Sequence, residues 1–256
     1  MMIHPTAIVH PSATIAAGVE VGPFCLIGEH VRIGAGTRLL SNVVINGHTT
    51  IGEASEIHPF CTIGAPSQDR KATSEISYTT IGDRTVLREY VSVHRATGAG
   101  EVTSVGDDTL LLAYVHIAHN CRIGNFVTMS NLAQLAGHVV IEDHAGVGGH
   151  TGVHQFVRIG RYSFVGGCSK LVRDVPPYLL AEGNPAEIYG LNSAGLRRHG
   201  LGHETLSELK EAFKTIYRSG RNLSQAVAEL KEAVRTDQGR EMLAFIEADS
   251  TRGILK

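Results

Sequence analysis

Aliphatic side chains recur at every sixth position along most of the chain. Stepping by six from Ile3 to Leu171, each position is aliphatic or Met apart from Asp69, Glu75 and Ala99. Neither the helical period of about 3.6 residues nor the two-residue period of a half-buried strand produces this spacing. A hexapeptide repeat is typical of a parallel β-helix, so the pattern predicts a mainly β fold.

In such a coil each hexad supplies one short strand and one turn, and three hexads close a triangular coil of about 18 residues. The aliphatic residue of each hexad points into the prism and stacks on its equivalents in adjacent coils. Coils built from hexads wind left-handed in known proteins, against the usual right-handed crossover. We therefore predict a left-handed parallel β-helix over residues 1–176, with polar loops near 67–80 and 96–104.

The last part of the chain has a helical pattern instead. The segment 202–220 places Leu206, Leu209 and later apolar residues on one face, and the segment 222–234 shows the same spacing. The hexad repeat has ended before both segments. A C-terminal α-helical domain is therefore predicted over residues 177–256.

The charge balance narrows the classes of partner. With 23 basic and 25 acidic residues the net charge is -2, which provides no extended field for nucleic acid or an anionic membrane. No apolar run reaches the length of about 18 residues that a bilayer-spanning helix needs. The start of the chain does not resemble a signal peptide. We expect a cytoplasmic protein without a nucleic-acid partner and without membrane insertion.

Four histidines converge when the one-coil period is applied to the chain. One coil after His119 comes Gly137, with His138 beside it. One coil further on comes Gln155, with His154 beside it. His116 lies at the preceding turn. The four imidazoles are thus predicted to form a band along one edge of the prism, although a single turn histidine can equally face water.

A band of imidazoles suits proton transfer or metal binding. Neutral imidazole is a common zinc ligand, so a trimeric β-helix enzyme of the carbonic-anhydrase type is one alternative. Gly137 favours acyl transfer, because a turn glycine can offer a backbone N–H to an oxyanion while His119 takes a proton from an attacking hydroxyl. A purely structural rod, the third class, predicts no convergent histidines.

Longer motifs carry a resemblance to a known family. They are "HIAHNCRIGN" (116–125), "LAGHVVIEDHAGVGGHTGVHQF" (135–156), "VGGCSKLVRDVPPY" (165–178), "GLNSAGLRRHG" (190–200) and "STRGILK" (250–256). Over essentially the whole chain the sequence resembles the UDP-N-acetylglucosamine 3-O-acyltransferase family, which performs the first step of lipid A synthesis. The coil alone indicates only a broad acyltransferase superfamily.

The resemblance implies a homotrimer with sites between subunits, with acyl carrier protein and a UDP-sugar as partners. It implies no metal, and no cofactor other than the phosphopantetheine of acyl carrier protein that holds the acyl donor. His119 is then the general base that deprotonates the sugar 3-hydroxyl as it attacks a 3-hydroxyacyl thioester. The Gly137 N–H stabilises the oxyanion, and Gly167 limits the length of the acyl chain.

The resemblance also implies a set of substrate-binding residues. Arg198 could instead belong to an ordinary basic face, and Gly167 could be only a turn glycine. The implied residues are Asp69 and Lys71, which reach a neighbouring subunit's site, His138 and His154 at the sugar, His116 at the diphosphate, and Gln155, Asn192 and Arg198 at the nucleotide.

Three positions depart from the family pattern. Asn120 follows the base where the family usually has Asp, and an amide can orient the imidazole but stabilises imidazolium less. Ala194 stands where a glutamate is common near the ribose, and "TSEI" at 73–76 replaces the family's "GEPT". The fine sugar contacts therefore leave an alternative acceptor open, a 3-amino analogue of the sugar with an amine nucleophile.

Overall fold

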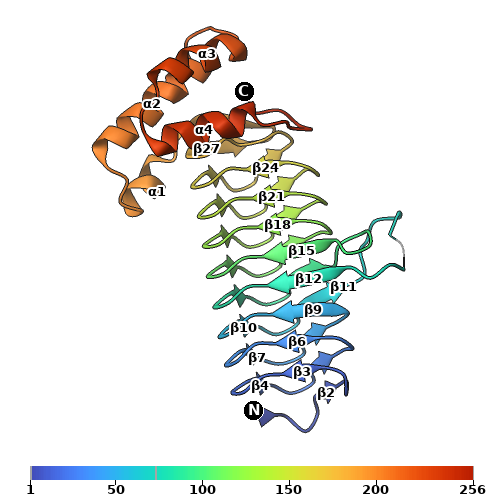
Figure 1. Ribbon diagram of the computed structural model, residues 1–256. Coiled ribbons are helices and arrows are strands. Elements are labelled where there is room, and N and C mark those ends of the chain that lie inside the picture. The colour runs from blue at the N-terminus through green and yellow to red at the C-terminus, as the bar shows by residue number, and fades with distance from the viewer. Residues whose placement is uncertain (1, 73, 256) are drawn as a thin grey trace.

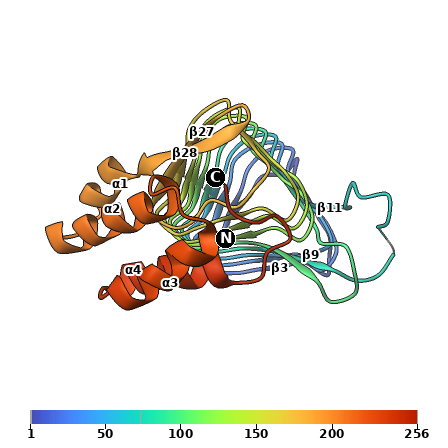
Figure 2. The same cartoon turned by 90° about the horizontal axis from the view of Figure 1, so that it is seen from above.

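The computed structural model describes residues 2–72 and 74–255 and shows a long prism of stacked coils with helices at one end (Figure 1). Each coil gives one strand to each of three sheets, named sheets A, B and C in chain order. Along the axis the coils superpose into a triangle (Figure 2). The turns form its three edges, which we name the A–B, B–C and C–A edges after the sheets they join.

The strands are short and alternate among the sheets. Sheet A contains β1 (Met2–Ile3), β4 (Glu20–Val21), β7 (Arg38–Leu39), β10 (Glu56–Ile57), β13 (Val86–Leu87), β16 (Leu110–Leu111), β19 (Thr128–Met129), β22 (Gly146–Val147), β25 (Phe164–Val165), β27 (Leu179–Gly183) and β28 (Ala186–Leu191). Sheet B contains β2 (Ile8–Val9), β5 (Leu26–Ile27), β8 (Val44–Ile45), β11 (Thr62–Ala65), β14 (Ser92–His94), β17 (His116–Ile117), β20 (Gln134–Leu135), β23 (Gly152–Val153) and β26 (Lys170–Leu171). Sheet C contains β3 (Thr14–Ile15), β6 (Arg32–Ile33), β9 (His48–Ile51), β12 (Tyr78–Ile81), β15 (Val102–Val105), β18 (Arg122–Ile123), β21 (Val140–Ile141) and β24 (Arg158–Ile159).

The hexad aliphatics form the core of the prism. In sheet B, Ile117 pairs in parallel with Val93 on one side and with Leu135 on the other. Ile117 and Val93 are 0% exposed, whereas Ile3 in the first coil is 38% exposed because that coil has a neighbour on one side only. Each fully buried aliphatic contributes roughly 1.5–3 kcal/mol. The interior stack, and not the turns, therefore holds the rod together.

Two insertions leave the rod at the B–C edge and project to one side (Figure 1). They span residues 66–77 and 95–101 and are shorter than the predicted loops 67–80 and 96–104, because β12 and β15 begin earlier and pair over four residues. The insertions preserve the phase of the repeat. A step between equivalent turns that takes 18 residues in a regular coil takes 30 and 24 residues across them.

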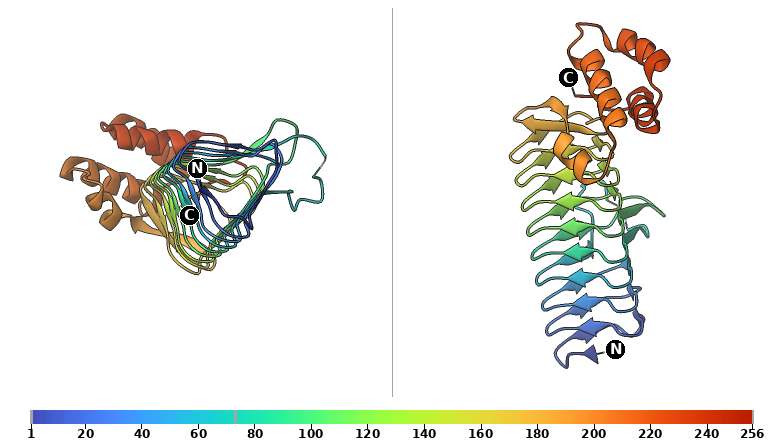
Figure 3. Two further views of the ribbon diagram at one scale, coloured as in Figure 1. Left: turned by 90° about the horizontal axis from the view of Figure 1, so that it is seen from below. Right: turned by 90° about the vertical axis from the view of Figure 1, so that its left-hand side faces the viewer.

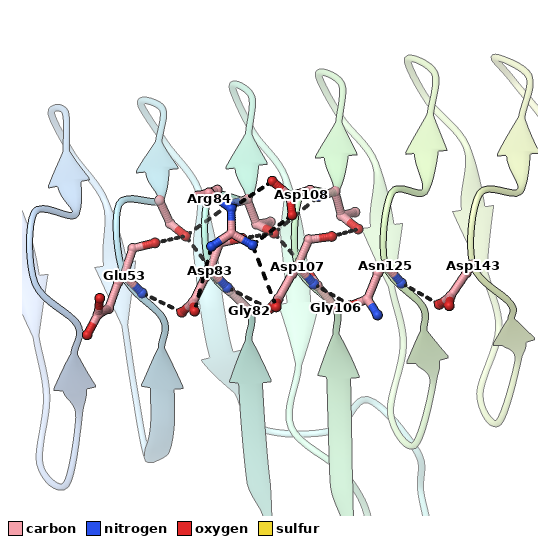
Figure 4. A network of polar contacts seen from close by, with 12 residues as sticks. Glu53, Gly82, Asp83, Arg84, Gly106, Asp107, Asp108, Asn125 and Asp143 are labelled. Atoms are coloured by element: carbon pink, nitrogen blue, oxygen red, sulfur yellow. Dashed lines mark hydrogen bonds and ion pairs between the residues drawn. The ribbon is translucent and has the colours of Figure 1, made fainter. Parts of the chain in front are cut away.

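A ladder of hydrogen bonds along the C–A edge explains several of the hexad glycines (Figure 4). An Asp83 carboxylate oxygen accepts from the Glu53 N–H at 2.7 Å, and an Asp107 oxygen accepts from the Asp83 N–H at 2.9 Å. A Cβ on Gly82 would lie 2.3 Å from Asp107 Oδ1. Only glycine at position 82 therefore leaves room for the Asp107 carboxylate that accepts from the Asp83 N–H.

Sheet A continues beyond the predicted boundary at residue 176. β27 pairs with β25 in parallel, and β28 returns antiparallel to β27. The segment 177–256 therefore begins with a hairpin on the last coil, and its helices begin only at Ser193. Leu179, Ala181 and Ile188 of this hairpin are buried, so their apolar side chains cover the end of the core as strands.

In the described part of the chain, four helices follow the hairpin, and Figure 3 shows them at the C-terminal end of the rod. The two predicted helices are confirmed as α2 and α3, while α4 was not predicted. An Asn222 and Gln225 capping box begins α3. Within the described residues, none of the helices is long and apolar enough to cross a membrane. The helices are α1 (Ser193–Arg198), α2 (His203–Tyr217), α3 (Leu223–Ala233) and α4 (Asp237–Glu247).

Candidate active site

A cleft of about 760 Å³ lies along sheet B beside the B–C edge. This volume is in the range of small-molecule sites. Its walls come from the 66–77 insertion, from β17, β20, β23 and β26, and from the turns that follow these strands. Six of the residues predicted for the site line this cleft: Asp69, Lys71, His116, His119, His154 and Gln155.

The floor of the cleft is one outward-facing row of sheet B. His116 pairs with Gln134, Gln134 with Gly152, and Gly152 with Lys170. A Cβ on Gly152 would meet no atom within 4 Å, so the glycine deepens the cleft. Lys170 supplies a cation at the far end of the row. Gln134 and Lys170 were not predicted, although the one-coil spacing from His116 could have identified them.

Asn120 fixes the orientation and the tautomer of His119. The Thr97 N–H donates to Asn120 Oδ1 at 2.9 Å, and Asn120 Nδ2 donates to the Thr97 carbonyl at 3.2 Å. A flipped amide would lose both bonds, so the oxygen faces His119 Nδ1, which lies 2.9 Å away. Because an amide oxygen can only accept, Nδ1 carries the proton. His119 Nε2 therefore keeps its lone pair and can act as a base.

Gly137 lies directly against this nitrogen. A Cβ on Gly137 would lie 2.4 Å from His119 Nε2, which no side chain permits. Among the described residues the Gly137 N–H has no hydrogen-bond acceptor. A base and an uncommitted backbone N–H therefore lie close together. This pair can remove a proton from a hydroxyl and stabilise the oxyanion that forms when the hydroxyl attacks a carbonyl.

The 66–77 insertion brings Asp69 to the same place. Asp69 Oδ2 lies 3.9 Å from His119 Nε2, and the Lys71 N–H donates to Asp69 Oδ1 at 3.0 Å. The base of the insertion is held by a hydrogen bond from the Thr97 hydroxyl to the Ser67 hydroxyl at 2.8 Å. In the described chain Asp69 therefore lies beside its own His119. The reason is that loop and base both leave the B–C edge.

The other predicted histidines do not form one vertical band. His138 makes an edge-on contact with His119, with ring centroids 5.1 Å apart, and stacks on Phe156 at 4.6 Å. His138 thus packs against the base, and it is not among the described residues that line the cleft. His116 lies on the face of sheet B, and His154 follows β23 directly. The four rings lie at different places on the prism because they occupy different positions within their hexads.

Burial lowers the pKa of two of these imidazoles. Burial, with a smaller effect of the neighbouring His94, lowers the pKa of His116 to about 4. Burial, followed by the nearby His119, also lowers the pKa of His138. His116 is therefore uncharged near neutral pH and offers hydrogen bonds to a ligand in place of a positive charge.

Three predicted residues lie away from the cleft. Asn192 is at the C–A edge, where its amide caps α1 by accepting from the Gly195 N–H at 3.2 Å and donates to the Tyr162 carbonyl at 2.9 Å. Arg198, at the end of α1, is exposed. Gly167 lies at the A–B edge between β25 and β26. The single chain does not bring these three residues to His119.

Of the departures from the family pattern, Asn120 is explained by its hydrogen bonds to Thr97. Ala194 is exposed in α1, and nothing in the structure explains it. In the segment 73–76, Thr73 lies outside the described residues.

Comparisons with known proteins agree along the whole chain. The family described as UDP N-acetylglucosamine O-acyltransferase, domain 2, matches residues 174–255, and the bacterial transferase hexapeptide family matches residues 30–65. The acyl-[acyl-carrier-protein]--UDP-N-acetylglucosamine O-acyltransferase of Alkalilimnicola ehrlichii is 48% identical over 255 residues, covering 99% of both chains.

Solved structures give the same result. The structure of LpxA from Acinetobacter baumannii is 42% identical, with a TM-score of 0.96 and 100% of both chains covered. The UDP-N-acetylglucosamine acyltransferase of Bacteroides fragilis is 36% identical, with a TM-score of 0.97 and the same coverage. These likenesses confirm the predicted fold class, a left-handed parallel β-helix of hexapeptide repeats with C-terminal helices.

Proposed function

The chain belongs to the UDP-N-acetylglucosamine O-acyltransferase family, and we propose that it moves a 3-hydroxyacyl group from acyl carrier protein to the sugar 3-hydroxyl with His119 as the general base. The acyltransferase activity, with an acyl carrier protein as donor and UDP-N-acetylglucosamine as acceptor, follows from family membership. The observation that carries the residue roles is the contact between His119 Nε2 and Gly137.

In the proposed reaction, the Nε2 lone pair of His119 takes the proton of the sugar 3-hydroxyl as its oxygen attacks the thioester carbonyl. The carbonyl oxygen becomes an oxyanion, which accepts a hydrogen bond from the Gly137 N–H. The tetrahedral intermediate then reforms the carbonyl, and the carbon–sulfur bond breaks. The His119 imidazolium returns its proton to the departing phosphopantetheine sulfur, so the base is regenerated.

Asn120 serves this mechanism through the tautomer of His119. Its Oδ1 accepts from Nδ1 both before and after proton transfer, because Nδ1 carries a proton in both states. A neutral amide stabilises the imidazolium less than a carboxylate does. Asp69, at 3.9 Å from Nε2, supplies a negative charge on the other side of the ring. We assign part of the missing stabilisation to it.

The substrate contacts are divided between the cleft and a neighbouring chain in this proposal. Lys71, His116, His154 and Gln155 line the cleft. The first three bind the sugar and its phosphates, and Gln155 binds the nucleotide. Asn192 and Arg198 lie at a different edge of the prism, so they can contact the nucleotide only from another subunit. This separation supports a homotrimer with closed cyclic symmetry and sites between subunits.

The trimer predicts rescue between two inactive variants. His119→Ala and Arg198→Ala enzymes, mixed after partial dissociation, should regain activity because some sites combine an intact base with an intact neighbouring arginine. Sedimentation should show a mass near three times that of the 27.4 kDa chain. A fully active monomer, or a mixture as inactive as its components, would contradict the shared site.

The acceptor and donor are tested by mass spectrometry of the products. The purified chain is offered UDP-N-acetylglucosamine and its 3-amino analogue with a ladder of hydroxyacyl carrier proteins. We expect an ester on the first sugar nucleotide, since the relatives are O-acyltransferases. Exclusive formation of an amide would establish the amino-sugar alternative. Activity lost with a chelator and restored by zinc would establish the carbonic-anhydrase type, which the comparisons do not favour.

Gly167 is proposed to limit acyl-chain length at the A–B edge, the far side of sheet B from His119. A Cβ there would approach the Gly149 carbonyl oxygen at 3.3 Å, so a side chain fits with a small adjustment. We expect Gly167→Met to shift preference to a chain several carbons shorter, because each methylene denied burial loses about 0.8 kcal/mol. The measurement is kcat/KM across the donor ladder. An unchanged ranking would leave Gly167 as a turn glycine.

A further inference from the structure

The C-terminal tail is fixed to the last coil through Asp174. The Asp174 side chain is 0% exposed, and its Oδ2 accepts from Arg158 Nε at 2.8 Å and from the Ser250 hydroxyl at 2.6 Å. Its backbone pairs with the tail, since the Asp174 N–H donates to the Gly253 carbonyl at 2.9 Å. In Figure 1 the tail crosses the end of the rod on the side from which the 66–77 insertion projects.

Ser250 then shapes the tail into a tight turn. Its hydroxyl oxygen accepts from the Arg252 N–H at 3.1 Å and from the Gly253 N–H at 3.0 Å. Gly253 has a φ of +64°, a left-handed conformation that glycine adopts without strain. After the turn, Ile254 and Leu255 are buried against the rod. The segments before and after Arg252 in the chain are thus both held in place.

The Arg252 guanidinium binds the turn that follows β23. Its Nε donates to the Gln155 carbonyl at 2.8 Å, and its Nη2 contacts His154 Nδ1. The same Nη2 is 3.5 Å from His154 Nε2, so Nδ1 is the nearer nitrogen. His154 and Gln155 both line the cleft. The tail therefore reaches the candidate active site through two lining residues.

This contact decides the tautomer of His154. A guanidinium has only N–H donors, so Nδ1 must accept, and the proton of the neutral ring is on Nε2. His154 Nδ1 also lies 3.3 Å from the Gln155 carbonyl oxygen, to which an Nδ1–H could donate if Arg252 were absent. Arg252 thus selects between two tautomers, one with a donor and one with an acceptor at Nε2.

We infer that Arg252 is a positioning residue for sugar-nucleotide binding, which holds His154 as an Nε2–H donor toward the acceptor substrate. The inference rests on the proposed function, because it assumes that the cleft binds the UDP-sugar. Hydroxyl and phosphate oxygens of that substrate accept hydrogen bonds, so a donor at Nε2 fits them. Arg252 acts on binding and not on the chemical step, since it touches neither His119 nor Gly137 in the described contacts.

The kinetic test uses Arg252→Met, which keeps an apolar stem and removes every donor. Losing a charge-assisted contact predicts a KM for UDP-N-acetylglucosamine roughly 10-fold to 100-fold higher. We expect kcat within about twofold of the wild type, as for loss of uniform binding. Arg252→Lys should be intermediate, because an ammonium cannot bind both acceptors as a planar fork. Arg221→Met, at an exposed pair with Glu229 on α3, is the matched control.

The spectroscopic test does not depend on activity. Long-range ¹H–¹⁵N spectra of the histidine-labelled full chain report the tautomer of each ring, and His154→Gln assigns the signal. Wild type should show the Nε2–H form, and Arg252→Met the Nδ1–H form. Ser250→Ala, which loosens the turn with little loss of packing, should shift the same ring partway. It also provides the readout if Arg252→Met folds poorly.

The outcomes separate the two proposals. If the wild type transfers no acyl group, the proposed function fails while the imidazole spectra still test the Arg252 contact. An unchanged His154 tautomer in Arg252→Met and Ser250→Ala, or an unchanged KM, would overturn the positioning role. In the His154→Gln background, Arg252→Met should raise KM little further, because the two residues act as a unit. Additive effects would instead show a role independent of His154.

Discussion

His119→Ala should lower kcat/KM by about 100-fold to 10,000-fold, the usual cost of removing a general base. The adjacent His138 cannot replace it, because its ring packs edge-on against His119 and stacks on Phe156. The fold should be retained, since the core is the column of buried aliphatics and a turn imidazole adds little to it. Steady-state kinetics, with thermal unfolding measured in parallel, check both parts.

His10→Ala is the matched control for this substitution. His10 follows β2 on the same B–C edge, in a coil near the N-terminal end, and its ring contacts the Ser12 hydroxyl, the Ser12 N–H and Glu29. We expect its kcat/KM to equal that of the wild type. Retention of more than about a hundredth of the activity by His119→Ala would show that another group removes the proton.

Gly137→Ala should lower kcat by about 100-fold or more, although it adds only a methyl group. The new Cβ would lie 2.4 Å from His119 Nε2 and 2.5 Å from Cε1, so the ring must turn away. Turning it breaks the Nδ1 contact with Asn120, and a misplacement of about 1 Å is enough to cost 100-fold. The backbone itself accepts alanine, because φ at Gly137 is not positive.

Gly190→Ala tests whether any glycine substitution has this effect. A Cβ at Gly190 would meet no atom within 4 Å, so we expect wild-type kinetics. The tautomer of His119, read from ¹⁵N imidazole shifts, should change in Gly137→Ala and not in Gly190→Ala. Full activity in Gly137→Ala would mean that the contact with Nε2 is not required and that the oxyanion is held elsewhere.

Much of the candidate site was predictable because the repeat converts sequence separation into distance. The step of one coil placed Gly137 beside His119, and the structure has them in contact. The same step from His116 leads to Gln134 and Lys170 on the face of sheet B, which the histidines of the turns do not indicate. It could not predict Thr97, whose insertion follows no period, although Thr97 holds the amide of Asn120 in place.

The sequence by itself determined the rod, its register and the meeting of base and glycine. An aliphatic stack buried on all sides permits only one phase, and both insertions preserve that phase. Only the tertiary structure decided which contacts the aperiodic segments make. The 66–77 loop reaches its own His119, and the tail carries Arg252 to His154. These segments are placed by single hydrogen bonds and buried carboxylates such as Asp174, which leave no periodic signal in the chain.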